Sequence, residues 1–349
     1  MSSYSLPQAP HSYREEEVHF QSGEATLAGV LCLPPGPGPY PAVIYIPGSG
    51  WAARDGFGML PQHWEAFARR GIASLSWDKP GVGDSSGDWT AQTMQDRAQE
   101  ALAAIRFLKG QPEIVPTKIG AWGISQAGWV LPLVCSLSSE SVAFLMAVSV
   151  PVGTGDEQEL FRIAHQLPAD GYPALTVDKA LAFSQLRIYL KNQHAPFDCI
   201  AQLQSLVEEE PWFAEVGAWD ADAYDFLRRL EADISIPRLL ETITCPVLAI
   251  FGERDTIVDG KQSAQVYACA LKKAGNADVT ITTFPAADHA LFLSETGGMK
   301  ELQQSFLKPA GQKIFAPGYL DFLAEWVQQR FGKRNQQAPE PGGHQPGGA

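Results

Sequence analysis

Residues 118–134 read KIGAWGISQAGWVLPLV, and this stretch decides how the rest of the sequence is interpreted. It begins as an apolar strand, reaches a lone serine, Ser125, and continues as an apolar helix with no loop between. Gly123 and Ala127 stand two residues to either side of that serine. Because a sharp turn brings the neighbouring backbone close, only tiny side chains fit at these positions. The pattern predicts a strand–serine–helix turn with a hydroxyl at its apex.

The chemistry of such a turn follows from its geometry. The turn lifts the Ser125 hydroxyl out of the sheet and aims the N-terminus of the following helix at it. The backbone N–H of Gln126 can then stabilise a developing oxyanion, helped by the helix dipole. The alternative is a serine that merely caps the helix, as serine readily does. The position directly after a strand favours a nucleophile over a cap.

Strand and helix patterns alternate on both sides of this turn. Strand-like runs cover residues 17–21, 25–33, 40–47, 72–78, 117–124, 142–150, 246–255 and 279–289. Helical patterns cover residues 63–71, 93–110, 126–137, 260–275 and 318–333. The first two strands read as a hairpin around Ser22 and Gly23. The alternation predicts an α/β fold with a mostly parallel sheet and helices on both of its faces.

The alternation breaks between Pro151 and Thr244, where the sequence is helical and aromatic without a convincing strand. We therefore expect a helical insertion after the sixth strand. The predicted division is a flexible arm (1–14), an α/β core (15–151 and 245–333), the insertion (152–244) and a disordered tail (334–349) rich in Pro, Gly and Gln.

The composition excludes several classes of function. The 349 residues carry a net charge of −13, so nucleic acid and anionic membranes are not expected as partners. No apolar run approaches the about 20 residues of a membrane-spanning helix, and the N-terminus does not read as a signal peptide. The five cysteines are scattered and form no CxxC pair, which predicts a reducing cytoplasm and no metal site. No cofactor is expected either.

A serine hydroxyl needs a base, and His289 is the natural candidate. It follows the last predicted strand, at the same carboxyl edge of the sheet as Ser125. An acid must orient the imidazole, and Asp255 stands at the end of the preceding strand. The competitors for this role are Glu253, Asp259, which better fits a helix cap, and Asp288, which adjoins the histidine in sequence. Asp255 is favoured, giving the chain order Ser, Asp, His.

A second oxyanion donor is expected from the loop after residues 40–47, which reads PGSGWAARDG from Pro47 onward. Glycines allow a backbone N–H to face inward. Ser49 is the predicted donor, with Gly50 and Trp51 as neighbours that could take its place. We call residues 47–51 the oxyanion loop.

Together these residues resemble the serine α/β-hydrolase superfamily. Between about residues 15 and 333, the stretches PAVIYIPGSG, LSWDKPGVGDSSGDW, IGAWGISQAGW and CPVLAIFGERDTIVD are similar to the bacterial branch of esterases, acyl-CoA thioesterases and prolyl-oligopeptidase-type hydrolases. The resemblance implies an eight-stranded core and a lid between strands six and seven. It also implies that Ser125, Asp255 and His289 are nucleophile, acid and base, and that Ser49 and Gln126 supply the oxyanion amides.

The sequence departs from that pattern at three points. Pro47 stands where many relatives have His, Pro80 where they often have Arg, and Ala127 where glycine is usual. None of these departures removes a catalytic group. Because Pro47 lacks an N–H, it could shift which amide of the oxyanion loop faces the oxyanion.

Two further patterns in the sequence bear on other kinds of binding site. The run GSGWAA after a strand, with Asp78 at the end of the next strand, matches a dinucleotide fingerprint. That fingerprint needs a helix opening directly on the glycines, whereas RDGFGMLPQ intervenes here. For an apolar substrate pocket, aromatic side chains are expected, and the candidates are Trp51, Trp129, Trp212 and Trp219.

The sequence therefore predicts a serine esterase that cleaves a small-molecule carboxylic ester, apolar or bulky, through an acyl-enzyme. Two alternatives within the fold are an acyl thioesterase and a peptidase. A third alternative, from another class, is a hydrolase-like ligand receptor without turnover. The nucleotide-binding oxidoreductase suggested by GSGWAA is the fourth.

Overall fold

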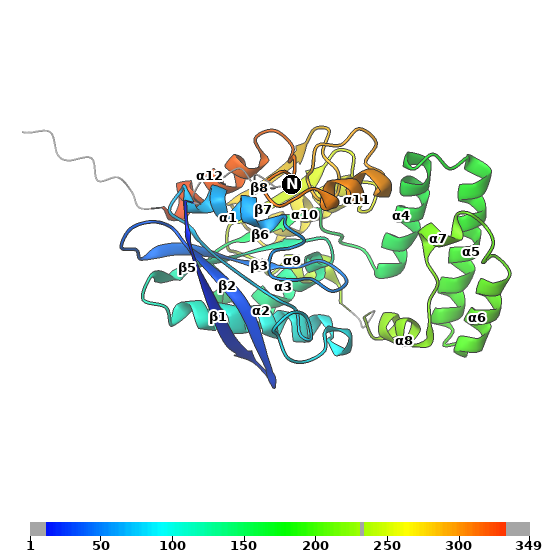
Figure 1. Ribbon diagram of the computed structural model, residues 1–349, viewed down its shortest axis with the longest axis horizontal. Coiled ribbons are helices and arrows are strands. Elements are labelled where there is room, and N and C mark those ends of the chain that lie inside the picture. Colours follow the sequence, from blue (N-terminus) through cyan, green and yellow to red (C-terminus); the bar gives the residue numbers. More distant parts are fainter. Residues whose placement is uncertain (1–11, 231–233, 333–349) are drawn as a thin grey trace, which may run out of the picture.

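The computed structural model describes residues 12–230 and 234–332, and it contains one eight-stranded sheet with the strand order β1-β2-β4-β3-β5-β6-β7-β8 (Figure 1). The strands are β1 (Arg14–Ser22), β2 (Ala25–Leu33), β3 (Tyr40–Ile46), β4 (Ala73–Trp77), β5 (Ile114–Ile124), β6 (Leu145–Val148), β7 (Val247–Gly252) and β8 (Val279–Phe284).

The sheet is mostly parallel, as the alternation predicts. β1 and β2 form an antiparallel hairpin, and β2 runs antiparallel to β4. From β4 through β3, β5, β6 and β7 to β8, neighbouring strands are parallel. The carboxyl ends of these six strands therefore meet at one edge of the sheet, where ligands bind in open α/β sheets.

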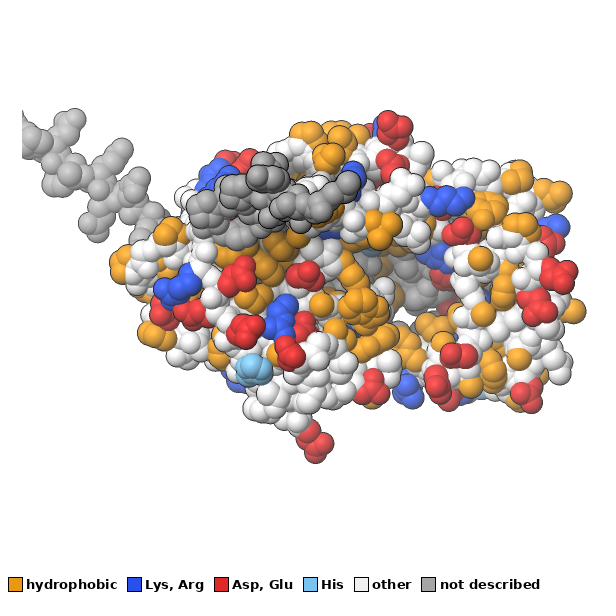
Figure 2. Space-filling model, in the orientation of Figure 1, with side chains coloured by type: hydrophobic (Ala, Val, Ile, Leu, Met, Phe, Trp, Pro, Cys, Tyr) orange, Lys and Arg blue, Asp and Glu red, His pale blue; other side chains and the backbone are white. Residues whose placement is uncertain are grey.

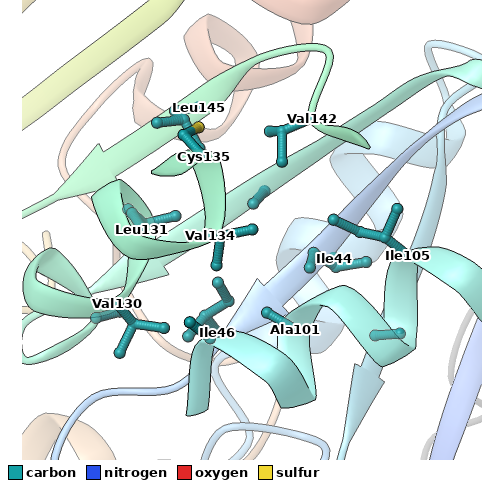
Figure 3. Packing of buried hydrophobic residues seen from close by; sticks show 14 of the residues in the cluster. Ile44, Ile46, Ala101, Ile105, Val130, Leu131, Val134, Cys135, Val142 and Leu145 are labelled. Atoms are coloured by element: carbon teal, nitrogen blue, oxygen red, sulfur yellow. The ribbon is translucent and has the colours of Figure 1, made fainter. Parts of the chain in front are cut away.

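Helices cover both faces of the sheet. One face packs against α2 (Met94–Lys109), α3 (Ala127–Leu137) and α10 (Gly260–Lys273), and Figure 3 shows Ala101, Val130 and Val134 meeting Ile44 and Ile46 there. The other face packs against α1 (Leu60–Ala68) and α12 (Tyr319–Phe331). Because both faces are covered, β3, β4 and β7 are buried along their whole length, which is why they read as apolar runs.

Local signals set the ends of the helices. Thr93 and Asp96 form a reciprocal capping box at the start of α2, and Gly110 ends that helix. Asp259 caps α10 by accepting a hydrogen bond from the Gln262 N–H at 2.9 Å. This is the cap that the sequence predicts for Asp259.

Helices fill the segment between β6 and β7. They are α4 (Gly155–Ala169), α5 (Ala174–Asn192), α6 (Phe197–Ser205), α7 (Phe213–Val216), α8 (Ala221–Leu230) and α9 (Ile236–Leu240). The first five of these lie beside the α/β body in Figure 1, and α4, α5 and α7 share a small apolar core of their own. We call α4–α8 the helical insertion.

The insertion ends earlier than the sequence indicates. The predicted range of 152–244 includes α9, yet Ile236, Leu240 and Ile243 are buried in the main core beside α3 and α10. Their apolar spacing is helical in either setting, so periodicity alone could not assign them to one core or the other.

The structure also contains elements that the sequence does not predict, and some predictions concern residues that the structure does not describe. The helix α11 (Met299–Leu307) and the 3₁₀ turn η1 (Trp89–Ala91) were not predicted. The predicted arm, apart from its last residues, and the predicted tail lie outside the described residues. In the part of the chain that the structure describes, no helix has both the length and the apolar character needed to cross a membrane.

Candidate active site

Ser125 lies in the tight turn that the sequence predicts. It follows the last residue of β5 directly, and α3 begins two residues later. Its φ angle is 57°, in the left-handed region that non-glycine residues rarely adopt. The Ser125 N–H donates to the Val148 carbonyl at 3.1 Å, which fixes the turn to the end of β6. A strained serine held at a strand end is the geometry of a nucleophile elbow.

Small residues make this turn sterically feasible. A Cβ on Gly123 would lie 2.8 Å from the Cβ of Ala127 and 3.1 Å from a methyl carbon of Leu131. Ala127 is fully buried, so there is no room for these atoms to move apart. The glycine and the alanine that flank Ser125 are therefore required by packing.

His289 and Asp255 are hydrogen-bonded to each other. The Nδ1 of His289 lies 2.9 Å from Oδ2 of Asp255, and the two side chains are only 11% and 1% exposed. The second oxygen, Oδ1, accepts from the backbone N–H groups of Ile257 and Val258, each at 2.9 Å. Asp255 is thus fixed by three donors, and it can hold the ring with Nε2 available for proton transfer.

The competing carboxylates have other partners. Glu253 accepts from the Ala286 N–H, Asp259 caps α10, and Asp288 accepts from backbone N–H groups in its own loop. Among the described residues, Asp255 is thus the carboxylate of these four that hydrogen-bonds to His289.

The surroundings of His289 favour its protonated, charged form more than bulk water does. Burial disfavours the imidazolium, but the charge and hydrogen bond of Asp255 outweigh burial, and the pKa of His289 is raised above 6.5. Asp288 adds to this effect. The pKa of Asp288 is itself raised to about 7, chiefly because its carboxyl is buried.

The sheet places Ser125, Asp255 and His289 at one edge. Ile124 is in register with Val148, which is in register with Ile250 of β7, and β7 pairs with β8 through Gly252 and Phe284. The Ser125 side chain is partly exposed. Within the described residues its hydroxyl is not hydrogen-bonded to His289, a contact that is often long or poorly aligned until a substrate is bound.

The oxyanion loop lies against the serine. A Cβ on Gly48 would meet the Ser125 Cβ at 3.2 Å and its Oγ at 3.7 Å, so glycine lets the loop approach closely. In the described part of the chain, the backbone N–H groups of Ser49 and Gln126 donate no hydrogen bond. Those of Gly50 and Trp51 are equally free there, so the choice among the loop amides stays a prediction.

Two buried basic side chains support this loop, and the sequence did not single them out. Lys79 Nζ donates to the Gly48 and Gly50 carbonyls, and Arg97 donates to the Pro47 carbonyl. One signal was present for Arg97, because it lies three residues from Met94 on the apolar stripe of α2. A charged residue on such a stripe indicates a buried polar contact.

The four tryptophans occupy different settings. Trp51 is the last residue of the oxyanion loop and is 54% exposed, with its ring 4.9 Å from that of Phe57. Trp129 donates to the Gly153 carbonyl at 3.0 Å, and Trp219 stacks under the Arg187 guanidinium. Trp212, by contrast, is 1% exposed within the core of the helical insertion. We therefore assign Trp212 to packing instead of to a pocket.

The dinucleotide interpretation does not fit the structure. The helix after GSGWAA begins only at Leu60, so the glycines do not lie at a helix N-terminus. Asp78 is 2% exposed and accepts hydrogen bonds from the Arg54 backbone and guanidinium at 2.6–3.0 Å. It is thus unavailable to a ribose hydroxyl.

Figure 2 shows that the surface is hollowed between the α/β body and the helical insertion, with hydrophobic side chains around the hollow. Contacts cross from one part to the other on two sides. The ring of Phe226 in α8 lies 5.9 Å from that of Trp89 in η1, and Lys300 in α11 donates its backbone N–H to Asp170 at the end of α4.

The model of the X-Pro dipeptidyl-peptidase (S15) family matches residues 22–290, a stretch that includes Ser125, Asp255 and His289. The chain belongs to this S15 family. It is also similar to curated relatives named esterase FrsA, such as that of Enterobacter sp. (strain 638), at 32% identity over 33% of this chain and 26% of the relative. The FrsA of Klebsiella pneumoniae (strain 342) is likewise 32% identical over the same shares. The S15 chain thus spans about a quarter of these relatives.

Solved structures show which fold this chain shares. The Pyrococcus furiosus esterase Pf2001 superposes with a TM-score of 0.58 at 15% identity, covering 92% of this chain and 93% of that one. Est1E from Butyrivibrio proteoclasticus gives 0.51 at 16% identity, covering 90% and 96%. A proline iminopeptidase from Mycobacterium smegmatis gives 0.52 at 16%, covering 90% and 98%. At such identities the likeness establishes the α/β-hydrolase fold.

Proposed function

We propose that this chain is a serine hydrolase that cleaves carboxylic esters through an acyl-enzyme on Ser125. The observation that carries the proposal is the Asp255–His289 hydrogen bond of 2.9 Å at the sheet edge where Ser125 stands in a strained turn. The esterase names of the FrsA relatives and of Pf2001 support an ester substrate.

The proposed reaction has two halves. Ser125 Oγ attacks the ester carbonyl carbon while His289 Nε2 takes its proton, and Asp255 stabilises the imidazolium that results. The carbonyl oxygen becomes an oxyanion facing the amides of Gln126 and the oxyanion loop. The C–O bond then breaks, and His289 returns the proton to the leaving alcohol. Water repeats the sequence on the acyl-enzyme and releases the acid.

The helical insertion is proposed to be a lid over this site. Two observations support this proposal: the insertion contacts Trp89 and α11 of the α/β body, and Figure 2 shows a hollow between the two parts. Closing such a hollow excludes water from the acyl-enzyme and shapes an apolar site for the substrate. On this proposal the substrate is a small molecule with an apolar or bulky group.

A peptidase is the second candidate, and the family match favours it. The matching model is that of X-Pro dipeptidyl-peptidases, and peptide cleavage uses the same serine, histidine and oxyanion groups. The difference lies in substrate binding, because a dipeptidyl-peptidase must also recognise a free amino terminus.

A substrate panel separates these candidates. We expect turnover of p-nitrophenyl butyrate at a kcat/KM of about 10⁴ M⁻¹s⁻¹ or more, and weaker turnover of an acyl thioester. Cleavage of an alanyl-prolyl p-nitroanilide with esters left intact would favour the peptidase instead. Saturable binding of ester or product without turnover would indicate a receptor and contradict the enzymatic proposal.

A further inference from the structure

Two basic side chains are buried beneath the oxyanion loop. Lys79, two residues after β4, is 2% exposed, and Arg97, in the first turns of α2, is 6% exposed. Within the residues that the structure describes, neither forms an ion pair with a carboxylate. Buried cations are costly unless their donors are satisfied. The hydrogen-bond partners of Lys79 and Arg97 therefore indicate the role of these two side chains.

Both basic side chains donate to carbonyls of the oxyanion loop. Lys79 Nζ donates to the carbonyl oxygens of Gly48 at 2.7 Å and Gly50 at 2.6 Å. Arg97 Nη2 donates to the carbonyls of Pro47 and, at 3.3 Å, of Gly48. The loop is thus held by two basic side chains, and at Gly48 it passes so close to Ser125 that an added Cβ would lie 3.2 Å from the serine Cβ.

These bonds fix the direction of the loop amides. In a planar trans peptide, the carbonyl of one residue and the N–H of the next point in opposite directions. The peptide bonds of this loop are trans. Holding the Gly48 carbonyl toward Lys79 therefore turns the Ser49 N–H away from the Lys79 amine, and holding the Gly50 carbonyl does the same for the Trp51 N–H. Both amides are left free to donate to a substrate oxygen.

Arg97 also reaches the other half of the oxyanion hole. Its Nη1 donates to the side-chain oxygen of Gln126 at 2.6 Å, next in sequence to Ser125. One guanidinium thus ties the residue at the start of α3 to the oxyanion loop. Because the guanidinium is a rigid planar fork, it sets the spacing between these two segments.

The protonation states suit this role. Burial and the neighbouring Arg97 lower the pKa of Lys79 to about 6. A neutral amine keeps two N–H groups, which match the carbonyls of Gly48 and Gly50. Burial lowers the pKa of Arg97 only to about 10, so a positive charge remains beneath the site at neutral pH. A fixed cation there favours a developing oxyanion.

We propose that Lys79 and Arg97 are positioning residues that hold the oxyanion loop with its amides facing the reacting carbonyl oxygen. This inference rests on the proposed serine-hydrolase function. It predicts an effect on the transition state, where the oxyanion exists, and little effect on substrate binding.

The test is Lys79→Met, which keeps the length of the side chain and removes its donors. With p-nitrophenyl butyrate we expect kcat to fall on the order of 10- to 100-fold, less than the loss of a direct oxyanion donor, with KM changed by less than about twofold. The affinity for a trifluoromethyl ketone, which forms an oxyanion on the serine, should fall by the same factor as kcat. Active sites are counted by fluorophosphonate labelling, so misfolded protein does not enter kcat.

Lys118→Met is the matched control. Lys118 also donates to a backbone carbonyl, that of Phe331, at 2.9 Å, but it lies within β5, six positions before the carboxyl end of that strand. It should keep wild-type kcat and inhibitor affinity. If Lys79→Met does not fold, Lys79→Gln retains an amide N–H₂ group on a shorter side chain, and it should show about a tenth of wild-type kcat with unchanged KM. Wild-type kcat in a folded Lys79 variant, or a loss confined to KM, would overturn the inference. Absence of ester turnover in the wild-type protein would instead refute the proposed function.

Discussion

The Nδ1 of His289 lies 2.9 Å from Oδ2 of Asp255, although 34 positions separate the two residues in the chain. They follow the neighbouring parallel strands β8 and β7, whose ends share the edge on which Ser125 stands. The Asp255 side chain is 1% exposed, and its other oxygen accepts hydrogen bonds from two backbone N–H groups. Its orientation is therefore fixed before any substrate arrives.

Asp255→Asn tests the role of this pair. The amide of asparagine preserves the shape of the side chain but offers His289 no negative charge. The imidazole ring of His289 can then take the wrong tautomer. We expect kcat for p-nitrophenyl butyrate to fall by about 10³- to 10⁴-fold while the fold is retained. Asp259→Asn is the control, since Asp259 only caps α10 and should leave kcat unchanged. Equal losses in the two variants would contradict the assignment of Asp255.

The pH dependence of turnover follows from the raised pKa of His289. The ring acts as a base only when neutral, so kcat/KM should fall as pH is lowered through a pKa above 6.5. Asp288 contributes to raising that pKa, so Asp288→Asn should move the acidic limb of the profile to lower pH. The asparagine can still accept the Ala290 and Phe292 N–H groups. An acidic limb that does not move would show that Asp288 is not coupled to the base.

Gly123→Ala tests the packing of the elbow. The added Cβ would lie 2.8 Å from the Cβ of Ala127, and neither atom can rotate away. We expect the free energy of unfolding to fall by about 1–3 kcal/mol, with a loss of kcat as the turn shifts. Gly110→Ala is the matched control, because its Cβ would meet only the Phe107 carbonyl, at 3.4 Å. Urea unfolding that gives equal stabilities for the two variants would rule out the steric account.

Truncation of Trp212 should affect stability, whereas truncation of Trp51 should affect substrate binding. Trp212 packs against Phe183 in the core of the insertion, so Trp212→Ala should cost about 3–5 kcal/mol of stability. Trp51 is 54% exposed, so Trp51→Ala should change stability by less than about 0.5 kcal/mol while raising KM for apolar esters. Thermal unfolding and ester kinetics measure both effects. An unchanged KM in Trp51→Ala would remove that residue from the substrate site.

The features that could be predicted from the sequence are those encoded locally. The elbow at Ser125 needs only a strand, tiny neighbours and a helix in succession, and the structure has that turn. The sheet edge could also be inferred, because parallel strands bring their carboxyl ends together. That argument places Asp255 and His289 at one edge of the sheet. Asp288 is less favoured as the partner of His289 because the side chains of adjacent residues rarely face each other.

The features that could not be predicted depend on contacts between distant segments. The bonds from Lys79 and Arg97 to the oxyanion loop join parts of the chain 29 to 50 residues apart, and no spacing rule encodes them. A tryptophan such as Trp212 can line a pocket or fill a core, and its residue type does not distinguish these roles. Its burial in the structure assigns it to the core. The same holds for α9, whose apolar residues fit either the insertion or the main core.

The central claim is that Ser125 becomes the covalent nucleophile. The most direct measurement is labelling of the wild-type protein with a fluorophosphonate, followed by mass spectrometry of the modified peptide. We predict that the adduct lies on Ser125, and that Ser125→Ala abolishes both the adduct and ester turnover while keeping the fold. Labelling at another serine, or ester turnover retained in Ser125→Ala, would contradict the account.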